Sequence, residues 1–124
     1  MELIEVAQNI RESIRLLGIG RKGLRDRSEA RANAIGNYEK EVGLTIMKLK
    51  NGVAFEIDGE KITNPPATLT EKIARAICYK SKIDSERADT EYKLAMKGLD
   101  VLQAELNGWQ SINRHLKDDP GYTQ

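Results

Sequence analysis

Apolar residues recur at alternating intervals of three and four positions along the first fifty residues. This heptad spacing is typical of a helix that packs lengthwise against a partner helix. It predicts a long helical segment over residues 1–50. The predicted packing positions, or seam, are Leu3, Ala7, Ile10, Ile14, Leu17, Arg21, Leu24, Ser28, Arg31, Ile35, Tyr38, Val42, Thr45 and Leu49.

Three glycines, Gly18, Gly20 and Gly23, crowd the middle of this segment, where the seam also becomes polar at Arg21 and Arg31. Each glycine inside a helix costs up to about 1 kcal/mol relative to alanine. Such a cluster either bends one helix or separates two helices by a tight turn. We expect a kink or break near residues 18–23.

A β-hairpin is predicted over residues 53–63. Apolar and polar residues alternate on both sides of Asp58-Gly59, a dipeptide that accepts the two positive φ angles of a type I′ turn. Two isolated strands are only marginally stable in water. The hairpin must therefore pack on another part of the chain or on another copy of it.

A second helix is predicted over residues 68–117, followed by a tail at residues 118–124. Asn64-Pro65-Pro66-Ala67 cannot be helical before its second proline, and Thr68 with Glu71 has the spacing of a capping box. Residues 81–90 are almost entirely polar, so the helix is expected to leave the shared core there. Its apolar positions include Leu69, Ile73, Ile77, Ile83, Tyr92, Ala95, Leu99, Leu102, Leu106, Trp109, Ile112 and Leu116.

These elements predict a mainly α fold, with two long antiparallel helical segments joined by the hairpin in a single domain, 1–124. Composition agrees, because 40% hydrophobic, 31% charged and only 5% aromatic residues suit helices with a narrow apolar seam. Such a chain buries little surface alone, so we expect a homo-oligomer, at least a dimer. The single Cys78 fits a reducing compartment, and neither a signal peptide nor a membrane span is expected.

The stretch from Arg11 to Arg31 is the first candidate for a functional site. It contains seven basic and three acidic side chains, with both end residues included. A glycine-rich break beside cations could present backbone N–H groups to a phosphate. The alternative is a solvated helix face with ion pairs. The candidate ligand-binding residues here are Gly18, Gly20, Arg21, Lys22 and Arg25.

The second candidate surrounds the only tryptophan. An indole beside amide and guanidinium groups could stack on a base and bond to its edge, and the residues concerned are Asn107, Trp109, Asn113 and Arg114. The alternative places Trp109 in the helical seam, in register with Leu102 and Leu106. His115 has no partner for zinc, and no nucleophile–base pair can be assembled. We therefore expect no enzyme activity, no metal and no cofactor.

Three strings carry a resemblance: Asn64-Pro65-Pro66-Ala67-Thr68, Glu71-Lys72-Ile73-Ala74, and Glu105-Leu106-Asn107-Gly108-Trp109-Gln110-Ser111-Ile112-Asn113-Arg114. With them the chain resembles small helical proteins of tailed phages and prophages. One such family is the Thoeris anti-defence sponges, oligomers that sequester a cyclic ADP-ribose immune signal without cleaving it. No binding motif of that family aligns here, so no site residue is carried over.

The resemblance implies a phage anti-defence protein in the host cytoplasm that holds a small nucleotide-like anion. We expect this ligand to bind where two protomers meet. The alternative is an accessory protein of phage recombination or replication that binds single-stranded DNA or a host protein. The net charge of +1 makes nucleic acid the less favoured partner.

Overall fold

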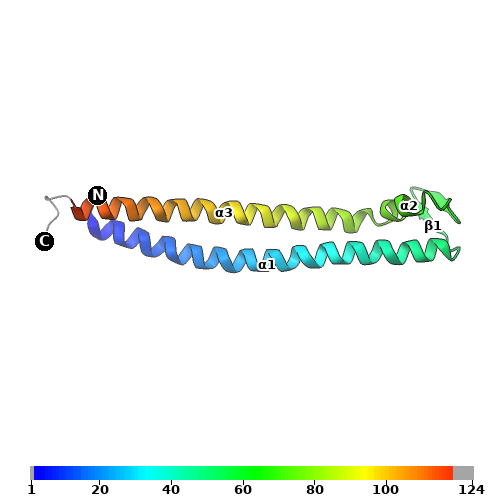
Figure 1. The fold of residues 1–124 in the computed structure, drawn as a ribbon, viewed down its shortest axis with the longest axis horizontal. Helices are drawn as coiled ribbons and strands as arrows, with labels where there is room; N and C mark the ends of the chain where they lie inside the picture. Colours follow the sequence, from blue (N-terminus) through cyan, green and yellow to red (C-terminus); the bar gives the residue numbers. More distant parts are fainter. Residues whose placement is uncertain (1, 119–124) are drawn as a thin grey trace. The chain divides into compact units, whose positions relative to one another are not determined.

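The structure is a computed structural model that describes residues 2–118, so most of the predicted tail lies outside the described residues. The mainly α fold is confirmed (Figure 1). The chain divides into two compact units, here called unit 1 (residues 1–27 and 92–124) and unit 2 (residues 28–91). The elements are α1 (Leu3–Lys50), β1 (Phe55–Ile57), β2 (Glu60–Ile62), α2 (Thr70–Ile77) and α3 (Tyr79–Asp118).

The predicted break near residues 18–23 is wrong, because α1 is one helix of 48 residues. Gly20 explains part of this result. A Cβ at this position would lie 2.7 Å from Leu99 Cδ2, so the bare backbone makes room for a packed leucine. The packing offsets the low helix propensity of glycine, which is about 1 kcal/mol per residue. Gly18, by contrast, faces open space.

In unit 1 the beginning of α1 packs antiparallel against the end of α3. The contact of Gly20 with Leu99 and Leu102 shows this direction, together with a groove that α1 residues near the N-terminus share with Asn113. The buried and half-buried seam on α1 consists of Leu3, Val6, Ile10, Ser13, Leu17, Gly20 and Leu24. The seam on α3 consists of Tyr92, Ala95, Leu99, Leu102, Leu106, Trp109, Asn113 and Leu116.

Part of the predicted seam of unit 1 is one residue out of register. Ile14 is 54% exposed, and the seam instead uses Ser13, as it uses Gly20 in place of Arg21. On α3, Ile112 is 40% exposed and Asn113 takes the inner position. At Gly20 the inner position is small because Leu99 packs on the backbone there. At all three positions a prediction from hydrophobicity alone selects the wrong neighbour.

In unit 2 the end of α1, the hairpin and α2 share one core. Its buried members are Tyr38, Val42, Leu49, Ala74 and Cys78, and Phe55 and Ile62 pack against them. The α1 positions from Arg31 to Leu49 agree with the predicted heptads. The hairpin is confirmed, with φ of 49° at Asp58 and 81° at Gly59. The cross-strand pair Phe55↔Ile62 packs on the core of unit 2, so the hairpin is supported by its own chain.

The second helix does not start or continue as predicted. The capping box at Thr68 does not form, since α2 begins after Leu69 without a side-chain cap. The Thr70 hydroxyl instead donates to the Pro66 carbonyl at 3.2 Å, closing a turn after the proline pair. Cys78, at φ −88° and ψ 23°, then separates α2 from α3.

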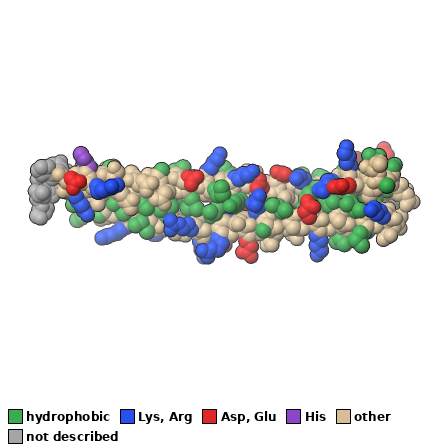
Figure 2. Space-filling view, viewed as in Figure 1, with side chains coloured by type: hydrophobic (Ala, Val, Ile, Leu, Met, Phe, Trp, Pro, Cys, Tyr) green, Lys and Arg blue, Asp and Glu red, His purple; other side chains and the backbone are tan. Residues whose placement is uncertain are grey.

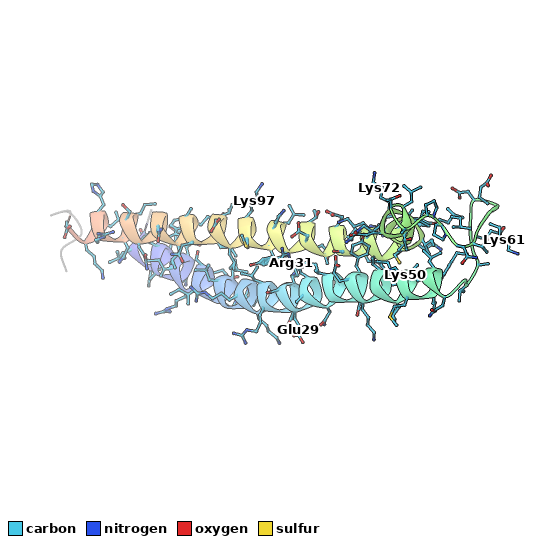
Figure 3. All side chains as sticks on the ribbon, turned by 45° about the vertical axis from the view of Figure 1, so that its right-hand side comes forward. Glu29, Arg31, Lys50, Lys61, Lys72 and Lys97 are labelled. Atoms are coloured by element: carbon cyan, nitrogen blue, oxygen red, sulfur yellow. The ribbon has the colours of Figure 1, made fainter. Side chains whose placement is uncertain are left out.

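The polar stretch at residues 81–90 does not leave the core. Ser81, Ser85 and Ala88 continue the heptad spacing of α3, and Ser85 is buried. Arg31 reaches from α1 toward α3, where its Nε donates to Asp89 Oδ1 at 2.7 Å (Figure 3). The α3 seam residues of unit 2 are therefore small or polar in this part, where the sequence pattern predicted that the helix leaves the core.

Candidate functional site

One side of unit 1 is rich in basic side chains. A helix turns by about 100° per residue, so the residues directly after the seam positions project to the same side of an antiparallel helix pair from both helices. We call this side the basic flank. It carries Arg11, Arg21 and Arg25 on α1 and Lys93, Arg114 and Lys117 on α3, with Asp100 as its acidic member.

Figure 2 shows Lys and Arg side chains on the face of unit 1 turned toward the viewer, with hydrophobic side chains between the helices. Amide side chains also follow seam positions on this flank of α3, and the Gln103 amide donates to Asn107 Oδ1 at 3.0 Å. Cations interleaved with amides favour an anionic partner that also offers hydrogen-bonding edges.

A groove opens at the end of unit 1 where α1 begins, with a volume of about 650 Å³. Its lining is mostly apolar, and Arg11, Asn113, Lys117 and Glu2 supply its polar groups. Sites for small ligands typically measure about 300–1,000 Å³ and combine apolar walls with a few convergent polar groups. The apolar lining residues are Leu3, Ile4, Ala7 and Ile10.

The glycine-rich candidate segment does not form a phosphate-binding loop. Gly18, Gly20, Arg21, Lys22 and Arg25 all lie within continuous α1, where the backbone N–H groups are used in helical hydrogen bonds. Gly20 is covered by Leu99, whereas Arg21, Lys22 and Arg25 are exposed. This segment can therefore offer side-chain cations to an anion, but no backbone cradle.

The tryptophan segment is split between the seam and the basic flank. Trp109 is half-buried in the seam, as the alternative reading had it, and Asn113 lines the groove from the neighbouring seam position. Asn107 and Arg114 are exposed on the basic flank. Among these residues, Asn113 and its neighbour Arg114 are the ones best placed to serve the groove.

The two candidate segments share a flank but not a site within one protomer. Gly20 lies at the level of Leu99 and Leu102, whereas the groove is at the level of Asn113. At 1.5 Å per residue this separation is roughly 16–21 Å along α3. A ligand of nucleotide size therefore cannot contact Arg21 and Asn113 together on one chain.

Lys117 of the groove was not selected from the sequence, and Arg11 was counted in the basic stretch without being selected as a ligand-binding residue. Each follows a seam residue directly, Ile10 on α1 and Leu116 on α3. Their common place directly after a seam residue could have identified them. This pattern becomes informative only when the antiparallel register of the two helices is known.

Outside the groove, the pKa values of several groups are shifted by their surroundings. The Arg15 guanidinium lowers the pKa of Glu12 through a hydrogen bond. The phenol oxygen of Tyr38 accepts a hydrogen bond from Arg75 at 3.2 Å and raises the pKa of that guanidinium. Burial raises the pKa of the Cys78 thiol, so it is a poor nucleophile. Among residues 2–118, no three His, Cys, Asp or Glu side chains are grouped as metal ligands.

Comparison with known proteins adds no relative, since the chain matches no protein-family model, no curated protein and no solved structure. Across the described residues, none of the helices combines the length and the apolar character that crossing a bilayer requires.

Proposed function

We propose that the protein acts by binding, without catalysis, and that its ligand is a small nucleotide-derived anion held in the groove of unit 1. The observation that carries the proposal is a groove with a mostly apolar lining in which the cations Arg11 and Lys117, with the amide of Asn113, outnumber the carboxylate of Glu2. A base needs an apolar surface and an amide to bond its edge, while phosphates need cations.

In this arrangement the phosphates lie between Arg11 and Lys117, with Arg114 on the adjoining turn. The base rests on Ala7 and Ile10, and Asn113 bonds to its edge. The resemblance to phage sponges supplies the biological setting, which is the sequestering of a cyclic ADP-ribose type signal in the host cytoplasm. The cations at Arg21 and Arg25 contribute a favourable potential along the flank rather than direct contacts.

Isothermal titration calorimetry against cyclic ADP-ribose isomers and cyclic dinucleotides tests the proposal. Wild type should bind at least one of them at micromolar concentration, and Arg11→Gln with Lys117→Gln should weaken binding at least tenfold. Lys97→Gln is the matched control, because Lys97 extends away from α1 in Figure 3. If no compound binds, or if the control weakens binding as much as the groove variants do, the proposal fails.

A second function, binding of single-stranded nucleic acid, is favoured by one observation. The cations of the basic flank extend over several helical turns, from Arg25 to Arg11 on α1, and a polyanion could follow them. Affinity of this kind falls steeply with salt as counterions are released. A gel shift at two salt concentrations distinguishes the two functions, since a groove ligand of low charge depends less on salt.

A further inference from the structure

The side of unit 1 opposite to the basic flank exposes large aliphatic residues on α3 and at Ile19 of α1, whereas Glu5 and Glu12 lie on its α1 part. It is formed by the residues directly before the seam positions, and we call it the apolar flank. On α3 it shows Leu94, Val101 and Ile112 at 63%, 58% and 40% exposure, and on α1 it shows Ile19 at 56%. From residue 94 to 112, the α3 positions of this flank are Leu94, Gly98, Val101, Glu105, Gly108 and Ile112, and His115 follows them.

The protein exposes more surface than a folded monomer of its mass. Its accessible surface is 9092 Å², whereas the size scaling of monomeric proteins gives about 6,700 Å² for 13.9 kDa. The excess of roughly 2,400 Å² belongs to the whole chain, with both units and the residues outside 2–118 included, and it is larger than the 800 Å² that each partner buries in a standard interface. The chain therefore has ample surface to cover in a dimer, and large aliphatic residues on the apolar flank make it a suitable place.

The α3 positions of the apolar flank have a symmetric spacing. Its intervals of four, three, four, three and four residues read the same in both directions along the helix. When two copies of α3 pair antiparallel about the level of Gln103, Leu94 lies opposite Ile112 of the second copy. Gly98 then lies opposite Gly108, and Val101 lies opposite Glu105. A two-fold symmetric interface uses the same patch on both copies, and this spacing permits such a pairing.

The glycines suit this pairing because nothing in the single chain occupies the space beside them. A Cβ built at Gly98 or at Gly108 meets no heavy atom within 4 Å. Their lack of a side chain thus serves no packing need within the described part of the chain. In the pair, glycine opposite glycine lets the two backbones approach, while Leu94 and Ile112 fill the wider ends.

We propose that a second copy of this chain packs on the apolar flank, with α3 antiparallel to α3 about a two-fold axis at the level of Gln103. The two basic flanks and both grooves stay uncovered in this dimer. The proposal is independent of the ligand, because it uses the opposite side of unit 1.

Cysteine cross-linking tests the register in a Cys78→Ala background. Leu94→Cys chains mixed with Ile112→Cys chains should give a disulfide-linked heterodimer. Neither variant alone should cross-link efficiently, because identical positions lie about 27 Å apart along the paired helices at 1.5 Å per residue. Cross-linking of either variant alone as efficient as that of the mixture, or none in the mixture, overturns the proposed pairing.

Analytical ultracentrifugation tests the surface itself. Wild type should sediment as a dimer at micromolar concentration, and Gly98→Gln or Gly108→Gln should raise the dissociation constant at least tenfold. Helix content should not fall, because glutamine is the better helix former. Gly18→Gln, at another exposed glycine of unit 1, is the matched control and should leave the dimer intact. A monomeric wild type, or dimers of equal strength in all three variants, would contradict the proposal.

Discussion

Leu99 packs directly on the backbone of Gly20, so closely that a Cβ at position 20 would lie 2.7 Å from Leu99 Cδ2. This contact gives a structural reason for a glycine inside a long helix. It also separates Gly20 from Gly18, which has the same chemistry two residues away but faces open space.

The first prediction compares alanine at these two positions. Gly18→Ala should raise the free energy of unfolding by about 0.5–1 kcal/mol, because alanine is the better helix former and meets nothing. Gly20→Ala should gain nothing or lose stability, because Leu99 must move to make room. Urea denaturation of both variants measures the difference. Equal stabilisation by both substitutions would show that Leu99 does not pack on Gly20 in solution.

The second prediction concerns the ion pair of Arg31 with Asp89, whose side chains are 42% and 23% exposed. A double-mutant cycle with Arg31→Met and Asp89→Asn should give a coupling of about 1 kcal/mol, at the upper end for partly exposed pairs. The matched control is the more exposed pair of Arg15 with Glu12, which should show weaker coupling. A coupling of zero for Arg31 and Asp89 would place this pair among surface contacts without effect on stability.

The third prediction follows from the raised pKa of Cys78, which is caused mainly by burial. Below about pH 8.5 the thiol is protonated in both folded and unfolded chains, so its contribution to stability is fully present. As the pH rises further, the unfolded thiol loses its proton while the folded thiol keeps it, and stability falls until the folded pKa is passed.

Denaturation at pH 7.5 and pH 9.5 measures this loss. Cys78→Ala should lose less stability over the same interval than wild type, although it is less stable at pH 7.5 because a buried group is removed. Identical losses for the two proteins would mean that the thiol titrates alike in the folded and unfolded chains.

Much of the fold follows from local sequence rules. The heptads from Arg31 to Leu49 and the Asp58-Gly59 turn need only spacing and backbone preference, and both are observed. The errors arise where a tertiary contact decides. Gly20 alone predicts a helix break, whereas Leu99 packs on it in the structure. Ser85 alone predicts a solvent-exposed position, whereas the side chain is buried within unit 2.

The groove could be predicted only in part. Asn113 was selected for its residue type beside Trp109, and it does line the groove. Arg11 and Lys117 lie 106 positions apart in the sequence and meet only through the antiparallel register of α1 and α3. The sequence pattern gives the period of each helix but not the alignment of one helix against the other.

We propose that the protein holds a nucleotide-derived anion intact in the groove of unit 1. The most direct measurement is a capture assay, in which the protein is incubated with cyclic ADP-ribose isomers, separated from free ligand by filtration and denatured, and the released ligand is quantified by chromatography. We predict that wild type and Lys97→Gln retain one isomer and release it chemically unchanged, whereas the Arg11→Gln/Lys117→Gln variant retains at least tenfold less. Absence of retained ligand, or recovery of a cleaved product, would contradict the account.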